Sequence, residues 1–225
     1  FLMYIRFVFP IALGLLGIAV LISLGIWQLQ RLDWKNNLLS NIEQKITAKP
    51  VRLMDEPTEL EDQYRSVIVE GSILPGEIHI LTSLKNIGPG FLVIVPFALA
   101  DGKTIMVDRG FVPEAEKKLN RSRGKVKLVG NLLWPNETDG FTPDPDVKKN
   151  MWFARDLEKM SNHLKTDAVL IVMRQSEPIG KPVPQQIGVH ISNDHLGYAI
   201  TWFSLAVVWF GMTILLVYRI KKRQV

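Results

Sequence analysis

The sequence predicts a membrane protein in which two terminal transmembrane α-helices flank a β-rich (α+β) exported domain, built as an antiparallel sheet or a small barrel. Three observations lead to this prediction. No charged residue occurs between Arg6 and Arg31, and no acid, lysine or arginine occurs between Asp194 and Arg219. Between these apolar stretches, short runs of β-forming residues are separated by Gly, Pro, Asn and Asp, as in a sheet with tight turns.

The two apolar stretches set the expected membrane segments. About 20 helical residues at 1.5 Å each cross a hydrocarbon core of about 30 Å, and both stretches reach that length. A cleaved signal peptide is the alternative for the first stretch, which is however long for a signal sequence and lacks a small-x-small cleavage site. The expected segments are a cytoplasmic tail (1–6), a transmembrane helix (7–29), the exported domain (30–195), a second transmembrane helix (196–218) and a basic cytoplasmic tail (219–225).

The distribution of charge sets the expected topology. All 22 acidic residues lie between Arg31 and Asp194, together with 22 of the 27 lysines and arginines, so the net charge of +5 belongs to the two tails. Positive tails are retained on the cytoplasmic side, which predicts cytoplasmic termini and a periplasmic central domain in a bacterial inner (plasma) membrane. The mitochondrial inner membrane is the less favoured alternative, since no transit-like segment begins the chain. A neutral domain argues against a nucleic-acid partner, and membrane lipid is the expected surroundings.

Cysteine is absent from the sequence. The exported domain therefore has no disulfide, although it would fold in an oxidising compartment. Thiolate copper delivery, CxxC redox chemistry and covalent attachment of haem to a CxxCH motif are excluded for the same reason.

The exported domain begins with a helix and continues as strands. The first membrane helix is expected to extend outward with a stripe of apolar residues four apart (Trp34, Leu38, Ile42 and Ile46), until Lys49-Pro50 ends it. Six runs then predict strands, at 64–71, 77–83, 91–99, 103–112, 125–134 and 168–174. A short helix at 156–164 presents Leu157, Met160 and Leu164 on one face, and Arg109-Gly110 predicts a bulge or turn in its strand.

Motifs for common enzyme chemistries are missing. The sequence has no GxSxG, Walker loop, HExxH or GxGxxG. His79 and His163 lack a helical histidine partner, so they are expected to be structural and no zinc site is predicted. No catalytic residue is proposed from the sequence, and the protein is not expected to be an enzyme.

A polar and aromatic cluster is predicted where both helices meet the outer membrane surface, because topology brings the end of the first span beside the start of the second. Its members are Trp27, Gln28 and Arg31 from the first segment and His195, Tyr198 and Trp202 from the second. One interpretation is ordinary membrane-interface anchoring. The other is a pocket for an amphiphilic planar cofactor, in which imidazole supplies an axial ligand and Arg31 meets carboxylates. Haem with a lipid-like tail has that shape, and composition alone does not choose.

Five motifs follow one another along nearly the whole chain: "GIWQLQR" from Gly25, "YRSVIVEG" from Tyr64, "VDRGFVP" from Val107, "WFARD" from Trp152 and "HLGYAITWF" from His195. This ordered set resembles the Surfeit locus protein 1 family of cytochrome c oxidase assembly factors. Phe111 and Phe153 depart from the tryptophan and tyrosine usual in the family, and Gly197 departs from it in the last motif.

The resemblance implies assistance in building the haem a-containing core of the oxidase. Haem a is the implied cofactor, with His195 matching the histidine proposed as ligand of the haem iron. The implied partners are cytochrome c oxidase subunit I and, as a further candidate, haem a synthase. A haem-free scaffold that stabilises early assembly intermediates is the alternative within the family. A two-span sensor or polysaccharide co-regulator is the alternative outside it, and no signalling domain supports that class.

Overall fold

The structure, a computed structural model, confirms the predicted fold class of two apolar terminal helices around a β-rich domain. It describes residues 2–222 except 86, 178–181, 186 and 188–192, with the backbone alone at 2–7, 176 and 177. The chain forms two compact units, a helical unit from residues 1–41 and 189–225 and a β-rich unit from Ile42 to Gly188. The predicted tail at 219–225 lies outside the described residues from 223 onward.

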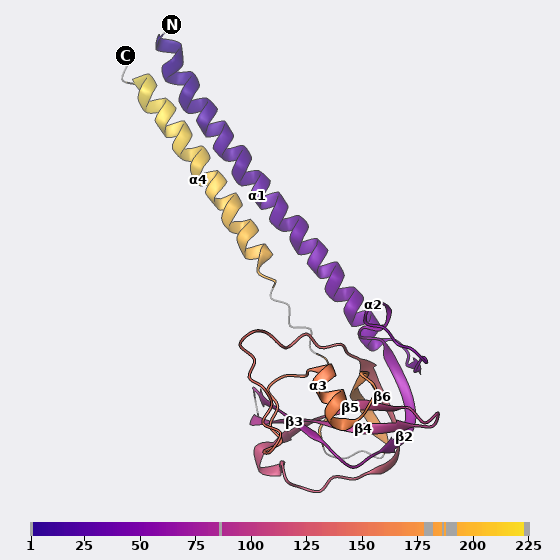
Figure 1. Ribbon diagram of the computed structural model, residues 1–225. Coiled ribbons are helices and arrows are strands. Elements are labelled where there is room, and N and C mark those ends of the chain that lie inside the picture. Colours follow the sequence, from indigo (N-terminus) through magenta and orange to yellow (C-terminus); the bar gives the residue numbers. More distant parts are fainter. Residues whose placement is uncertain (1, 86, 178–181, 186, 188–192, 223–225) are drawn as a thin grey trace. The chain divides into compact units, whose positions relative to one another are not determined.

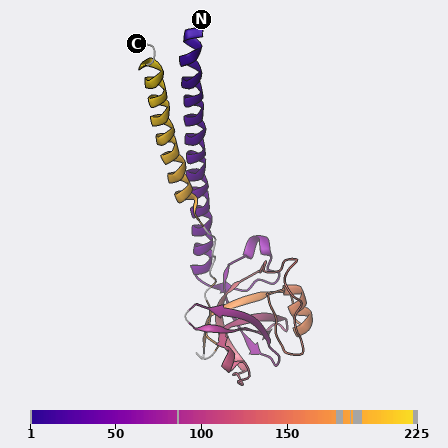
Figure 2. The same ribbon diagram turned by 90° about the vertical axis from the view of Figure 1, so that its left-hand side faces the viewer.

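The helical unit contains most of α1 (Leu2–Thr47) and all of α4 (His195–Lys222). Both helices are long and apolar enough to cross a membrane, with mean hydropathies of 2.4 and 2.1 in their most apolar windows. They lie side by side and antiparallel in both views (Figures 1 and 2). The helical extension beyond the first apolar stretch is confirmed, since α1 continues to Thr47 and stops before Pro50. The membrane boundaries at 29 and 196 stay predictions.

One stripe of α1 is more buried than the rest of its surface. Its members recur three and four residues apart, which is the spacing of a packed helix pair: Gly14, Ile18, Leu21, Gly25, Gln28, Leu32, Lys35 and Leu39. The stripe predicted through Trp34 and Leu38 is therefore wrong. Those two side chains are 54% and 37% exposed, and Gln28 lies within the buried stripe.

Small residues bring the two helices into close contact. A methyl group added at Gly25 would lie 2.6 Å from the ring of Phe203, and one at Gly17 would lie 2.5 Å from the indole of Trp209. On α4, Ala199 is almost fully buried. Large side chains of one helix thus fill gaps left by glycine on the other, which is the usual way for apolar helices to pack closely.

The β-rich unit is a small closed barrel. Its sheet order is β1-β2-β6-β7-β5-β4-β3, and an additional pairing of β2 with β4 closes a ring of five strands (Figure 1). The elements are β1 (Val51–Arg52), α2 (Glu59–Asp62), β2 (Ser66–Ile73), β3 (Ile78–Leu84), β4 (Gly88–Leu99), β5 (Thr104–Pro113), η1 (Glu114–Glu116), β6 (Gly124–Leu132), α3 (Leu157–Leu164) and β7 (Leu170–Glu177).

The barrel alternative of the prediction is confirmed, but the sheet is not wholly antiparallel. β5 pairs with β7 in parallel, and β1 pairs with β2 in parallel. A closed ring with an odd number of strands cannot alternate direction throughout, so at least one neighbouring pair must be parallel. The chain from β5 to β7 runs through β6 and α3, which is long enough for the crossover that a parallel pair needs.

Both faces of several strands are buried, which explains their nearly continuous apolar sequences. Alternate residues fill the barrel interior, including Val93, Val95 and Phe97 of β4. Residues between them, such as Ile94, join an outer cluster that packs against Met160 of α3. The predicted helix is confirmed, and Asp156 caps it by accepting a hydrogen bond from the backbone N–H of Lys159.

The predicted bulge lies at Arg109-Gly110. These two residues of β5 stand opposite the single residue Val93 of β4. Gly110 has φ +106°, and its N–H donates to Oδ1 of Asp108 at 2.9 Å. Arg109 turns away and donates to the carbonyl of Ser122 at 3.0 Å. The bulge therefore sets the directions of two polar side chains, Asp108 and Arg109, within the barrel wall.

The last turn of α1, which belongs to the β-rich unit, is held by side chains of the barrel. The carbonyl of Ile46 accepts hydrogen bonds from Nδ2 of Asn131 at 2.9 Å and from Nη1 of Arg174 at 2.7 Å. Arg174 is the additional residue of a second bulge, where β7 pairs with β6. A cation at the carboxyl end of a helix satisfies free carbonyls and complements the helix dipole.

Arg155 joins a buried acid to an acid of the long loop between β6 and β7. Its Nη1 lies 3.3 Å from Oδ2 of Asp108, which is 1% exposed, and its Nε lies 2.9 Å from Oε1 of Glu137. Burial opposes ionisation of Glu137, but the hydrogen bond and positive charge of Arg155 outweigh it and hold the pKa of Glu137 below its ordinary value.

A pH dependence follows from this ion pair. Because the folded-state pKa of Glu137 lies below its unfolded value of about 4.3, the carboxylate stabilises the fold above that pH and loses its effect as pH falls toward the folded value. Glu137→Gln should therefore lower the urea concentration at the midpoint of unfolding at pH 7, and the difference between its midpoint and that of the wild-type protein should narrow between pH 5 and pH 3.5. Glu158→Gln, an exposed control, should have nearly the same midpoint as the wild-type protein. If the difference for Glu137→Gln does not depend on pH, Glu137 is not the group responsible.

Candidate functional site

The predicted cluster contains one direct polar contact between the two apolar helices. Nδ1 of His195 lies 2.7 Å from Oε1 of Gln28, although the two residues are 167 positions apart. His195 is the first residue of α4, and Gln28 is a buried position of the α1 stripe with 9% exposure. Of the three members predicted from the first segment, Gln28 is the one that meets His195.

This contact fixes the chemistry of the imidazole. An amide oxygen only accepts hydrogen bonds, so the hydrogen of the neutral ring lies on Nδ1 and donates to Gln28. Nε2 then keeps its lone pair. A histidine whose Nδ1–H is held by an oxygen acceptor, with Nε2 available, is the usual arrangement of an imidazole metal ligand.

A second contact holds the chain just before α4. Nδ2 of Asn193 donates to Oδ1 of Asn36 at 2.9 Å, two turns further along α1 than Gln28. This pair was not predicted, because the two asparagines carry no motif of their own. Their signal was positional, since Asn36 follows the first apolar stretch and Asn193 precedes the second.

The other predicted members lie around this pair, but among the described residues they do not form one hydrogen-bonded network with it. Arg31 places its guanidinium over the ring of Trp34, 4.7 Å from the ring centre. Trp27 is 50% exposed and Tyr198 is 58% exposed, while Trp202 is half-buried. Among the described residues, Gln28 is the hydrogen-bond partner of the imidazole. Arg31 and the aromatic residues therefore flank the pair with accessible surfaces.

One histidine as the metal-binding side chain suits an iron held in a macrocycle better than a free metal ion. Within the described part of the chain, no three histidine, aspartate or glutamate side chains lie close enough to hold a metal. A haem iron already has four equatorial ligands and needs from the protein only an axial donor, such as Nε2 of His195. The exposed rings of Trp27 and Tyr198 offer apolar contacts, and Arg31 offers a cation for carboxylates. These residues fit a haem.

The histidines of the barrel have structural surroundings. Nε2 of His79 lies 2.9 Å from Oε1 of Glu77, and the ring is 5% exposed. His163 packs its ring edge-on against Trp152, with ring centres 5.6 Å apart. Neither lies near a second ring nitrogen or a group of acids that could share a metal with it within the described residues. His190 lies outside them.

Comparison with known proteins agrees with the pattern of motifs. The SURF1 family model matches residues 15–207. Surfeit locus protein 1 of Rattus norvegicus is 33% identical over 221 residues, covering 85% of this chain and 72% of the relative, and the Homo sapiens protein is 32% identical over 218 residues, covering 84% and 72%. A SURF1-like protein of Rickettsia felis is 27% identical over 225 residues, covering 94% of this chain and 96% of the relative. On this similarity, which spans both apolar helices and the barrel, the chain belongs to the SURF1 family.

Proposed function

We propose that this protein assists the assembly of haem-copper cytochrome c oxidase by binding haem a at the outer membrane surface and presenting it to subunit I. The contact between Gln28 and His195 is the observation that carries the proposal. The contact holds one imidazole on the pair of apolar helices with its hydrogen in a defined position. Membrane anchoring alone does not require such an oriented imidazole. Family membership supplies the context of oxidase assembly.

Each member of the cluster has a role in this proposal. His195 would hold the haem iron through Nε2, and Gln28 orients the ring by accepting the hydrogen of Nδ1. Arg31 would supply a cation for the propionates, and Trp27, Tyr198 and Trp202 would offer apolar contacts. Bound haem a supplies an iron centre that the protein stores. No bond is made or broken by the chain, so the protein acts as a chaperone of the cofactor and not as an enzyme.

The membrane arrangement completes the proposal. Helices α1 and α4 cross the bacterial inner membrane with both termini cytoplasmic, and the barrel lies in the periplasm. The positive residues near the ends of the apolar stretches support this orientation. The barrel would then contact subunit I, or the haem a synthase that delivers the cofactor.

The test is purification of the protein from cells that make haem a. The wild-type protein should show a haem absorption spectrum, and pyridine extraction should identify the pigment as haem a. His195→Ala should reduce the haem content at least about tenfold, because the axial bond is lost. Gln28→Leu keeps the imidazole but removes its hydrogen-bond acceptor, so it should give an intermediate haem content and an altered iron-ligand spectrum. Loss of a residue that orients a metal-binding histidine costs about 10- to 100-fold in affinity.

His163→Ala is the matched control, since His163 lies in the barrel and is expected to leave haem content unchanged. Equal haem in His195→Ala and wild type would exclude His195 as the ligand. A protein that purifies without haem yet brings oxidase subunit I with it would instead support the haem-free scaffold, in which the helix faces and the barrel stabilise early assembly intermediates.

A further inference from the structure

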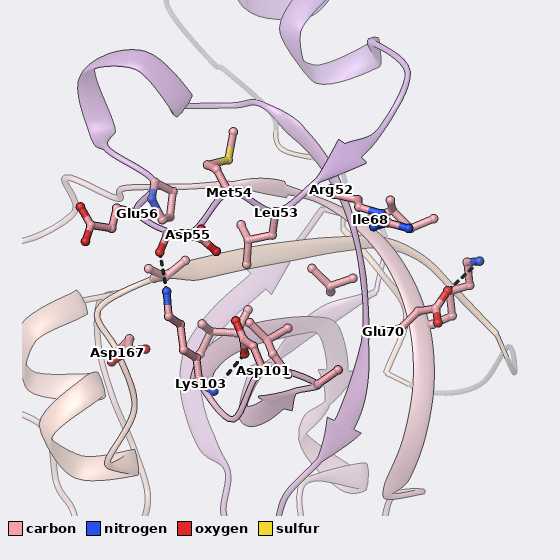
Figure 3. Close-up of a pocket in the computed structure, with 17 residues that line it drawn as sticks. Arg52, Leu53, Met54, Asp55, Glu56, Ile68, Glu70, Asp101, Lys103 and Asp167 are labelled. Carbon is pink, nitrogen blue, oxygen red and sulfur yellow. Dashed lines mark hydrogen bonds and ion pairs between the residues drawn. The ribbon is translucent and has the colours of Figure 1, made fainter.

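A large cavity lies at the end of the barrel that carries the turn between β4 and β5. It has a volume of about 830 Å³ and is open to solvent. The lining comes from the segment after β1, from β2, from the β4–β5 turn and from the residues before β7 (Figure 3). All of these segments belong to the β-rich unit, so the cavity does not involve the haem-site residues.

A gap in the barrel wall accounts for the cavity. On one side of β2, β1 pairs as far as Ile68 and β4 pairs from Gly71 onward. Val69 and Glu70 lie between these two partners and have no strand beside them on that side among the described residues. The wall is therefore open for two residues, where an extended backbone could lie against the exposed edge of β2.

The floor of the cavity is apolar. It is formed by side chains of the barrel interior and by residues packed against them: Leu53, Met54, Val69, Leu99, Ile105 and Val169. Leu53 and Met54 are only partly buried, although they contact the main core. An incoming apolar side chain would thus continue the hydrophobic core of the barrel instead of resting on a polar surface.

Charge is unevenly arranged around the opening. Asp55, Glu56 and Asp167 lie on one side, and Arg52 and Glu70 lie on the other (Figure 3). Glu70 pairs with Lys127 at 2.8 Å. Lys103 lies on the acidic side but donates to the backbone carbonyl of Asp55 at 2.7 Å.

Lys103 is a single cation on a side that carries three carboxylates, and it donates to a backbone oxygen and not to these carboxylates. Within the described part of the chain, the carboxylates of Asp55, Glu56 and Asp167 have no hydrogen-bond or ion-pair partner. They do not converge as metal ligands either. Spread along one rim above an apolar floor, these charges match a ligand that carries several positive charges at intervals, together with apolar side chains.

We propose that this cavity docks an extended peptide segment of a partner protein, in which apolar side chains alternate with lysine or arginine. The apolar side chains enter the floor and the basic ones face Asp55, Glu56 and Asp167, since successive side chains of a strand point to opposite sides. The proposal goes beyond haem binding and does not depend on it. It gives the barrel a partner-binding role of its own.

The test uses the full chain in nanodiscs of phosphatidylcholine, which carry no net charge. The probe is a fluorescein-labelled hexapeptide that alternates leucine with lysine, and the comparison peptide alternates leucine with glutamate. Fluorescence anisotropy should show that the lysine peptide binds at least about tenfold more tightly, and that added salt weakens it. Asp55→Asn combined with Asp167→Asn should weaken binding about fivefold, the effect of removing two partly exposed ion pairs.

The matched control is Glu114→Gln combined with Glu158→Gln, which removes the same charge from exposed positions of the same unit outside the cavity. Ala100→Trp, at the exposed rim, should abolish binding by filling the cavity while leaving the fold intact. Equal affinity for both peptides, equal loss in the control pair, or no binding at 1 mM peptide would each overturn the proposal. Haem content should be the same in Ala100→Trp and in the wild-type protein, so a failure of the peptide-docking proposal can be distinguished from a failure of the haem-binding proposal.

Discussion

Gly110→Ala is expected to destabilise the barrel more than any other substitution of glycine by alanine in its strands. Gly110 has φ +106°, a conformation that costs a residue with a side chain about 1–3 kcal/mol. An added methyl group would also fall against the carbonyl oxygen of Val183, closer than the 3.0 Å limit of real contacts. That oxygen belongs to the backbone and itself accepts the N–H of Phe111 at 2.8 Å. It cannot move away without breaking a hydrogen bond.

The control separates the two causes. Gly102 in the β4–β5 turn has φ +92°, but nothing lies within 4 Å of an added methyl group. Gly102→Ala should therefore show the conformational cost alone. We expect urea unfolding in detergent, followed by circular dichroism, to give a clearly larger loss for Gly110→Ala, with proteolysis of the β-rich unit at 37 °C. Equal losses of stability in the two variants would mean that the backbone at Val183 moves to accommodate the methyl group at little cost.

Local features of the barrel could be predicted from the sequence, but its closure could not. Alternation and turn residues located all six long strands, and Arg109-Gly110 indicated the bulge, because these signals lie within a few residues of one another. Closure depends on pairs such as Gly71 with Leu99 and Met106 with Leu170. Alternation tells which side chains share a face and not which strand lies alongside, so the parallel neighbour of β5 was not foreseen.

The buried face of α1 was predicted wrongly beyond the membrane stretch for a related reason. The prediction ranked positions by hydrophobicity and chose Trp34 and Leu38. Over the apolar stretch every face of α1 carries apolar side chains, so the packed face is marked by small and polar residues instead. The same face continues into the extension of α1, and Trp34 and Leu38 lie off it. Gly14, Gly25 and Gln28 mark the face that α1 presents to α4. Their regular spacing is present in the sequence, but the prediction followed the hydrophobic residues and did not use it.

Topology could predict the depth of the candidate-site residues but not which of them meet. Two antiparallel spans bring the start of one beside the end of the other, so it placed Gln28 and His195 at one depth. Which side chain faces the partner depends on rotation of the helix about its axis. That rotation is set by Gly25 and Phe203, one turn away. The topology alone therefore gave no reason to prefer Gln28 over Trp27 or Arg31 as the partner of the imidazole.

Gly25→Leu is accordingly expected to lower haem binding without touching a haem-site residue. Leucine forms helix better than glycine, by somewhat less than the about 0.8–1.0 kcal/mol that separates glycine from alanine, so α1 itself should become more stable. Its side chain would occupy the space of the Phe203 ring, which lies 2.6 Å from the position of the first added carbon. The helices must separate or rotate, and the 2.7 Å contact between Gln28 and His195 should be lost. Haem content of the purified protein should fall to about that of Gln28→Leu or below.

Gly211→Leu is the matched control, because it changes the same residue type in α4 where nothing lies within 4 Å. A second readout does not require haem. In this cysteine-free chain, Gln28→Cys with His195→Cys should be joined by a short bifunctional thiol reagent, and adding Gly25→Leu should lower the yield severalfold while Gly211→Leu should not. If cross-linking falls but haem remains, the imidazole binds haem without Gln28. If neither changes, Phe203 rotates aside, and the glycine does not set the distance between the two helices.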